Sequence, residues 1–113
     1  MHKLAAILLV LIIAFHGTFG QWLVGGYSDY PELIQDDTVL LLTDFAVEYL
    51  STARNLKLTN VEVTRVRTQA VSGTNYKINF TGDDGAQKME CEVVVYLGFN
   101  LNKSVSDADC DPL

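Results

Sequence analysis

The feature that most constrains the fold is a change of hydrophobic period near residue 57. Before it, over residues 38–53, apolar residues recur at steps of three and four, the spacing of a helix with one buried face. After it, apolar and polar residues alternate in short segments bounded by turn-forming residues, which is typical of strands. One helix followed by strands joined through hairpins predicts an α+β domain, with an antiparallel β-sheet wrapped around one long α-helix.

The helix is expected to follow Asp36 and Asp37, because capping side chains and negative charge suit a helix N-terminus. The spacing of its apolar residues predicts a face buried in the core rather than a cofactor site. That face comprises Leu41, Leu42, Phe45, Ala46, Tyr49, Leu50 and Ala53.

The strands show one irregularity, which lies in the first of them. Val61 and Val63 share one parity, whereas Val66 falls on the other. This pattern indicates either a β-bulge or a strand that extends beyond the core. Turns are predicted at residues 82–85 and 98–100, which contain Gly and Asp or Asn. The predicted strands are residues 61–68, 75–81, 88–97 and 101–109.

Residues 1–20 are expected to form a secretory signal peptide. Lys3 gives a positive start, residues 4–15 are apolar, and small residues near Gly20 offer a cleavage point. The alternative is a membrane anchor, but a bilayer-spanning helix needs about 20 apolar residues, more than this run supplies. The folded domain is then expected to cover residues 21–113 of a secreted, extracellular protein.

The segment to be removed contains both histidines, His2 and His16. The remaining domain lacks imidazole, which argues against histidine-dependent catalysis and against the commonest zinc ligand. No catalytic residue, metal or cofactor is predicted. Loss of Lys3 takes the formal net charge from −6 to −7, since 8 basic and 14 acidic residues are present in the full chain. Neither nucleic acid nor a membrane is an expected partner of so acidic a domain.

Cys91 and Cys110 are the two cysteines of the chain. In a secreted protein an even number of cysteines favours one intrachain disulfide. The alternative is a free nucleophilic cysteine, which would have no histidine to activate it.

The chain also contains glycosylation sequons and a short acidic motif. Asn79 and Asn102 each begin a glycosylation sequon, so both are candidate acceptors. Residues 107–111 resemble the start of a calcium-binding loop, but the Gly and the final Glu of that motif are missing. An acidic, solvated tail is the expected interpretation.

Three stretches, taken in chain order, resemble the cystatin family. They are Leu23-Val24-Gly25-Gly26, the Gln-x-Val-x-Gly sequence Gln69-Ala70-Val71-Ser72-Gly73, and a hairpin near Gly98 between the two cysteines. The resemblance covers essentially all of residues 21–113 and implies the cystatin fold. It matches Cys91 and Cys110 to the second disulfide of the secreted cystatins. The family's first disulfide is absent, and Leu97-Gly98-Phe99 stands where a Pro-Trp pair is usual.

The resemblance also implies a function, which is reversible tight-binding inhibition of papain-like cysteine peptidases such as cathepsins of the L, B or S type. An N-terminal arm and two hairpin loops would enter the active-site cleft without forming a covalent bond. The alternative is a non-inhibitory secreted binding protein of the same fold. A monomer is expected, with a domain-swapped dimer as the alternative. The implied peptidase-binding residues are Leu23, Val24, Gly25, Gln69, Ala70, Val71, Ser72, Gly73, Leu97, Gly98 and Phe99.

Overall fold

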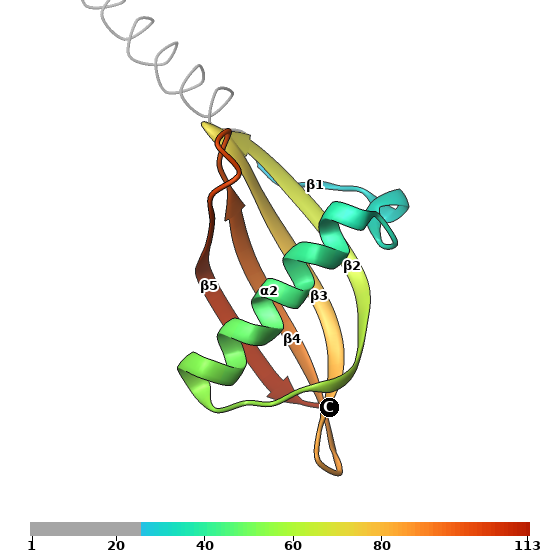
Figure 1. The fold of residues 1–113 in the computed structure, drawn as a ribbon. Helices are drawn as coiled ribbons and strands as arrows, with labels where there is room; N and C mark the ends of the chain where they lie inside the picture. The colour runs from blue at the N-terminus through green and yellow to red at the C-terminus, as the bar shows by residue number, and fades with distance from the viewer. Residues whose placement is uncertain (1–25) are drawn as a thin grey trace, which may run out of the picture.

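The computed structural model describes residues 26–113, which form one α-helix and a five-stranded antiparallel sheet. Each strand pairs with the next one along the chain, so the sheet order is β1-β2-β3-β4-β5. The helix lies diagonally across one face of the sheet (Figure 1). This arrangement confirms the predicted α+β fold. The elements are β1 (Ser28–Asp29), the 3-10 turn η1 (Pro31–Leu33), α2 (Asp37–Arg54), β2 (Thr59–Val71), β3 (Gly73–Asp84), β4 (Gln87–Leu97) and β5 (Lys103–Pro112).

Both ends of α2 are set by local chemistry. The carboxylate of Asp36 accepts hydrogen bonds from the backbone N–H groups of Thr38 (3.1 Å) and Val39 (3.2 Å), which would otherwise have no partner in the first turn. At the other end Asn55 adopts a left-handed conformation with φ 52°, which asparagine tolerates better than most residues. The predicted helix, residues 38–53, is therefore correct to within one residue at each end.

The buried face of α2 is shifted relative to the prediction. Leu41 is 58% exposed and Ala53 is also exposed, so assigning these two residues to the core was wrong. The diagonal crossing leaves one side of the predicted stripe outside the contact with the sheet. Thr43 is buried instead, and its hydroxyl donates to the carbonyl oxygen of Val39 at 2.8 Å. The buried residues of α2 are Val39, Leu42, Thr43, Ala46 and Leu50.

β2 contains two register shifts against β3, one between Thr59 and Glu62 and one between Val63 and Arg65. Each shift adds one residue to β2, as a β-bulge does. Because of the second bulge, Val63 and Val66 can both be buried although they are three residues apart. The change of parity in the sequence is thus explained by a bulge.

The core lies between α2 and the sheet. Its largest fully buried strand residues are Val66 of β2, Phe80 and Ile78 of β3, and Val93 and Val95 of β4. Cys91 pairs with Cys110 across β4 and β5, and the two form a disulfide. The predicted disulfide is therefore confirmed, and no cysteine among the described residues is free.

The hairpin connections lie at opposite ends of the sheet, as an antiparallel meander requires. The β2–β3 and β4–β5 connections share one end, whereas the β3–β4 turn and the C-terminus lie at the other (Figure 1). The backbone N–H of Leu113 donates to the carbonyl oxygen of Lys88 at 2.9 Å, which fixes the C-terminus there. Over residues 26–113, no helix combines the length and the apolar character needed to span a membrane.

Candidate functional site

The first tip, defined here as residues 69–73, closes the β2–β3 hairpin. Val71 pairs with Gly73 across a bend at Ser72. Below the bend, the side-chain amide of Asn75 donates to Oε1 of Gln69 at 3.1 Å, which links the two strands. Val71 is 41% exposed. The predicted hairpin is confirmed, and it presents an apolar side chain at its end.

The second tip, defined as residues 98–102, connects β4 to β5. The N–H of Gly98 donates to the carbonyl oxygen of Asn102 (2.9 Å), and the N–H of Leu101 donates to that of Gly98 (3.0 Å). Phe99 is 84% exposed and Leu101 is 73% exposed. Of the three residues predicted here, Phe99 projects into solvent, whereas Leu97 is half-buried and Gly98 is buried.

The prediction that Leu101 lies in a strand is wrong. Leu101 was predicted to begin a strand, but β5 begins at Lys103 and Leu101 lies in the second tip with φ 65°. Such a left-handed conformation is uncommon for a branched residue and is imposed by the turn. The available sequence signal was weak, namely two apolar residues on either side of Asn100 in a short turn.

The first tip is in direct contact with β4, the strand that leads into the second tip. The hydroxyl of Tyr96, on β4, donates a hydrogen bond to the carbonyl oxygen of Ser72 in the first tip. Gly73 has φ 108°, and a Cβ at this position would lie 2.7 Å from the carbonyl oxygen of Leu97 and 2.7 Å from Oη of Tyr96. The first tip therefore approaches β4 so closely that a side chain on residue 73 has no room. Tyr96 is not among the site residues predicted from the sequence.

The chain enters the sheet beside the first tip. Ser28 pairs with Thr68 and Asp29 with Arg67, in antiparallel register. Because the strands are antiparallel, the chain traced back from Asp29 to Gly26 runs toward the end of β2 that carries the first tip. The predicted contact residues of the arm, Leu23, Val24 and Gly25, lie outside the described residues.

Tyr27 holds the start of the described chain against the sheet. The Nζ atom of Lys77 lies 4.4 Å from the centroid of the Tyr27 ring, a cation–π distance. Burial raises the pKa of the Tyr27 hydroxyl, and the nearby Arg67 acts in the opposite direction. Gly26, one residue earlier, has nothing within 4 Å of its ideal Cβ position. A side chain at residue 26 would therefore have room.

A bidentate ion pair between Arg65 and Asp29 fixes β1 to β2. Arg65 donates from Nε (2.7 Å) and from an Nη atom (2.8 Å) to the two carboxylate oxygens of Asp29. These hydrogen bonds hold the pKa of Asp29 below its ordinary value of 3.8. Because the folded-state pKa is lowered, this contribution to stability is fully present above pH 3.8 and is lost as the pH falls through the lower, folded-state value. The pair is thus intact in any mildly acidic medium.

The two candidate glycosylation sites differ in their surroundings. Asn79 is half-buried in the middle of β3, and its Oδ1 accepts a hydrogen bond of 2.7 Å from Arg67. Arg67 also forms an ion pair with Glu92 on β4. Asn102 is exposed, in the second tip. Asn102 is therefore the more accessible of the two.

An apolar groove extends from the second tip toward the beginning of α2. Leu101 lines it at one side and the exposed Leu41 at the other. Leu41, although part of the apolar stripe of α2, thus lies at this groove and not in the core. The groove is lined by Thr38, Leu41, Leu42, Leu97, Leu101 and Lys103.

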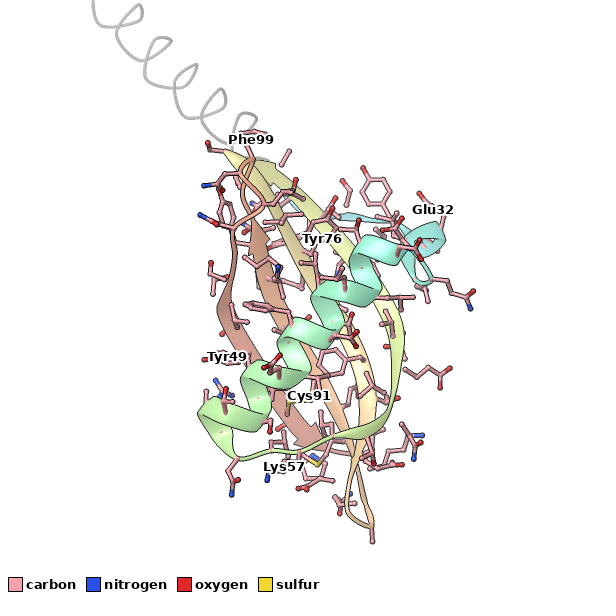
Figure 2. The ribbon with its side chains drawn as sticks, in the orientation of Figure 1. Glu32, Tyr49, Lys57, Tyr76, Cys91 and Phe99 are labelled. Atoms are coloured by element: carbon pink, nitrogen blue, oxygen red, sulfur yellow. A yellow bond between two sulfur atoms is a disulfide. The ribbon has the colours of Figure 1, made fainter. Side chains whose placement is uncertain are left out.

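The end of the molecule that carries the first and second tips thus presents apolar side chains from both. Figure 2 shows Phe99 at this end, far from Cys91 and Lys57. Within residues 26–113, no three His, Cys, Asp or Glu side chains are grouped so that they could hold a metal ion. The arrangement suits insertion into a concave, apolar cleft on another protein.

Comparisons with known proteins agree with this geometry. Residues 25–103 match the cystatin domain family. Among solved structures, the chain is similar to a salivary cystatin from the soft tick Ornithodoros moubata, with a TM-score of 0.65 and 25% sequence identity. The similarity covers 77% of this chain and 97% of that one. No match was found among curated proteins.

Proposed function

Because the chain belongs to the cystatin family, we propose that it is a reversible, tight-binding inhibitor of papain-like cysteine peptidases such as cathepsins L, B and S. The proposal is supported by the family match, since cystatins are protein inhibitors rather than enzymes. The observation that carries the proposal is that Val71, Phe99 and Leu101 are exposed on two neighbouring tips. A hydrogen bond joins the first tip to β4, the strand that leads into the second tip. Exposed apolar groups on a rigid projection are costly for an isolated protein and useful in an interface.

In this proposal the inhibitor acts as a wedge made of three parts. Leu23 and Val24 of the arm fill pockets on one side of the catalytic centre, and Gly25 lets the backbone pass close to it. Val71 of the first tip packs against the wall of the cleft, together with the backbone of residues 69–73. The second tip covers the other side. Inhibition is steric, since no bond to the peptidase is formed.

The energetics favour such a wedge because the tips are already folded. Loops that keep their conformation on binding lose little conformational entropy, so a modest apolar area can give tight binding. At the second tip, where Leu97-Gly98-Phe99 replaces the usual Pro-Trp pair, the exposed apolar side chains are those of Phe99 and Leu101. Loss of a central tryptophan costs on the order of 1 to 3 kcal/mol, and the two smaller side chains offset part of that loss.

Titration of active papain with residues 21–113 tests the proposal. A fluorogenic substrate reports residual activity, and the expected result is stoichiometric loss that is reversed on dilution. Absence of inhibition at about 1 μM protein would defeat the inhibitor proposal. The chain would then be a secreted binding protein of the cystatin fold that uses the same end for another ligand, and the missing Pro-Trp pair would be the reason.

Deletion of residues 21–24 is expected to weaken inhibition of cathepsin L-like enzymes at least tenfold, which corresponds to about 1.4 kcal/mol. The reason is that the deletion removes the side chains of Leu23 and Val24. It leaves β1, which begins at Ser28, and the ion pair between Asp29 and Arg65 in place. The melting temperature should therefore stay at the value of the longer protein. An unchanged inhibition constant would exclude the arm from the mechanism.

We also propose that residues 1–20 direct secretion and that Asn102 receives a glycan there. A disulfide between Cys91 and Cys110 is compatible with an oxidising compartment. In protein secreted from a eukaryotic host, enzymatic deglycosylation should lower the intact mass, and Asn102→Gln should abolish that change. Asn79→Gln is the control, since Asn79 is half-buried and bonded to Arg67. A mass change that depends on Asn79 would contradict this assignment.

A glycan on Asn102 would lie beside Phe99 and Leu101, within the second tip. The glycosylated form is therefore expected to inhibit papain less strongly than the deglycosylated form. The protein is expected to be a monomer in either form, and size-exclusion chromatography distinguishes it from a domain-swapped dimer.

A further inference from the structure

We propose that Tyr96 is a positioning residue, which fixes the first tip relative to the second and thereby raises the affinity for the peptidase. This inference rests on the proposed function and concerns the same end of the molecule. Tyr96 itself need not touch the peptidase. It acts through Ser72 and Gly73, which belong to the first tip.

Tyr96 is held firmly by the sheet. It pairs with Asn75 of β3 on one side and with Ser104 of β5 on the other, so its backbone is fixed by two strands. Its neighbour Val95 is fully buried beneath α2, and successive side chains of a strand point to opposite faces. The Tyr96 ring therefore lies on the face of the sheet that is turned away from the helix.

The hydroxyl of Tyr96 reaches a backbone group that the strands do not pair. The last pair of the β2–β3 ladder is Val71 with Gly73, and Ser72 lies in the bend beyond it. The carbonyl oxygen of Ser72 accepts the hydrogen bond from the Tyr96 hydroxyl, although the two residues are 24 positions apart. A phenol has only two side-chain torsions, so this link is rigid compared with one made by a longer polar side chain.

Gly73 complements Tyr96 in shape. A Cβ on residue 73 would lie 2.7 Å from Oη and 3.0 Å from Cε1 of Tyr96. Because Gly73 has no side chain, there is room beside it for the ring of Tyr96. The ring also lies close to the start of the second tip, since a Cβ on Gly98 would lie 3.4 Å from Cε2 of Tyr96.

The expected benefit is preorganisation. Without the hydroxyl, the bend at Ser72 is free to move relative to β4 and has to be ordered again on binding. A single hydrogen bond of this kind changes an equilibrium roughly three- to tenfold. Tyr96→Phe is therefore expected to raise the inhibition constant for papain by that factor, because it removes the donor and keeps the ring.

The test measures the inhibition constant, the melting temperature and the backbone 15N order parameters of Tyr96→Phe. Weaker inhibition and lower order parameters at Ser72 and Gly73 are expected, with a fall in melting temperature no larger than the loss of one hydrogen bond causes. Tyr49→Phe is the matched control, since Tyr49 lies on α2 far from Phe99 (Figure 2). It should change none of the three quantities.

A double-mutant cycle with Val71→Ala separates positioning from a general structural role. If Tyr96 positions the first tip, the fold-loss caused by Val71→Ala is smaller in the Tyr96→Phe background than in the wild type. A merely structural role gives multiplicative fold-losses and leaves the order parameters of Ser72 and Gly73 unchanged. That result, or an inhibition constant unchanged within twofold, overturns the inference.

Failure of the proposed function is distinguishable from failure of this inference. If the wild-type protein does not inhibit papain, the proposed function fails and the effect on affinity fails with it. The order parameters of Ser72 and Gly73 in Tyr96→Phe still decide whether Tyr96 fixes the first tip. Unchanged order parameters overturn the positioning role whatever the inhibition assay gives.

Discussion

Gly73→Ala is expected to weaken inhibition of papain at least about a hundredfold, or roughly 2.7 kcal/mol. Gly73 has φ 108°, a conformation that residues with a Cβ rarely adopt. The added methyl group would also meet the carbonyl oxygen of Leu97 at 2.7 Å. That oxygen belongs to a strand paired on both sides, with Thr74 and Lys103, so the first tip has to move instead.

Gly85→Ala is the matched control for this variant. Gly85 also has a positive φ, 60°, but it lies in the β3–β4 turn at the opposite end, with nothing within 4 Å of its ideal Cβ position. Both substitutions should lower the free energy of unfolding by about 1 to 3 kcal/mol because of backbone strain. Only Gly73→Ala should also lose inhibition. Equal inhibition by the two variants would show that the close approach of the first tip to β4 is irrelevant to binding.

Removal of the disulfide is expected to lower the free energy of unfolding by roughly 3 kcal/mol. Cys91 and Cys110 are separated by 19 positions, so the bond restricts a loop of that length in the unfolded chain. Guanidinium unfolding of the variant with both Cys91→Ala and Cys110→Ala, compared with the wild type, measures the change. A midpoint equal to that of the wild type would contradict the prediction.

Inhibition by the same variant provides a second measurement. The disulfide lies toward the end opposite Phe99 (Figure 2), and Leu97 still pairs with Lys103 at the base of the second tip. At temperatures where the variant is folded, its inhibition constant should therefore stay within about threefold of the wild-type value, less than one hydrogen bond's contribution to binding. A larger loss would mean that the bond shapes the tips as well as stabilising the fold.

Most of the fold could be predicted because its signals are local. The limits of α2 follow from Asp36 and Asn55, whose side chains favour the conformations found at helix ends. The strand alternation likewise identified β3 and β4. The bulge near Val63 could not be distinguished from an extended strand, since a change of parity has both solutions. The exposure of Leu41 depends on the crossing direction of α2, which no local pattern encodes.

The candidate site also contains parts that could be predicted from local sequence and parts that could not. The first tip was predictable, because Gly73 and its neighbours form a turn from adjacent residues. Tyr96 was not, since its role depends on a hydrogen bond to a residue 24 positions away. Leu101 was misassigned because its positive φ comes from hydrogen bonds within the second tip. The hydrophobic period of a sequence does not determine which distant segments of the chain come into contact.

The bulges of β2 bear on how the protein avoids aggregation. β1 covers only Thr68 and Arg67, so most of the outer edge of β2 has no strand partner among the described residues. A long, regular edge strand is a template on which other chains can assemble into fibrils. Two bulges and the charged Arg65 interrupt this edge. These interruptions make the outer edge of β2 a poor template for such assembly.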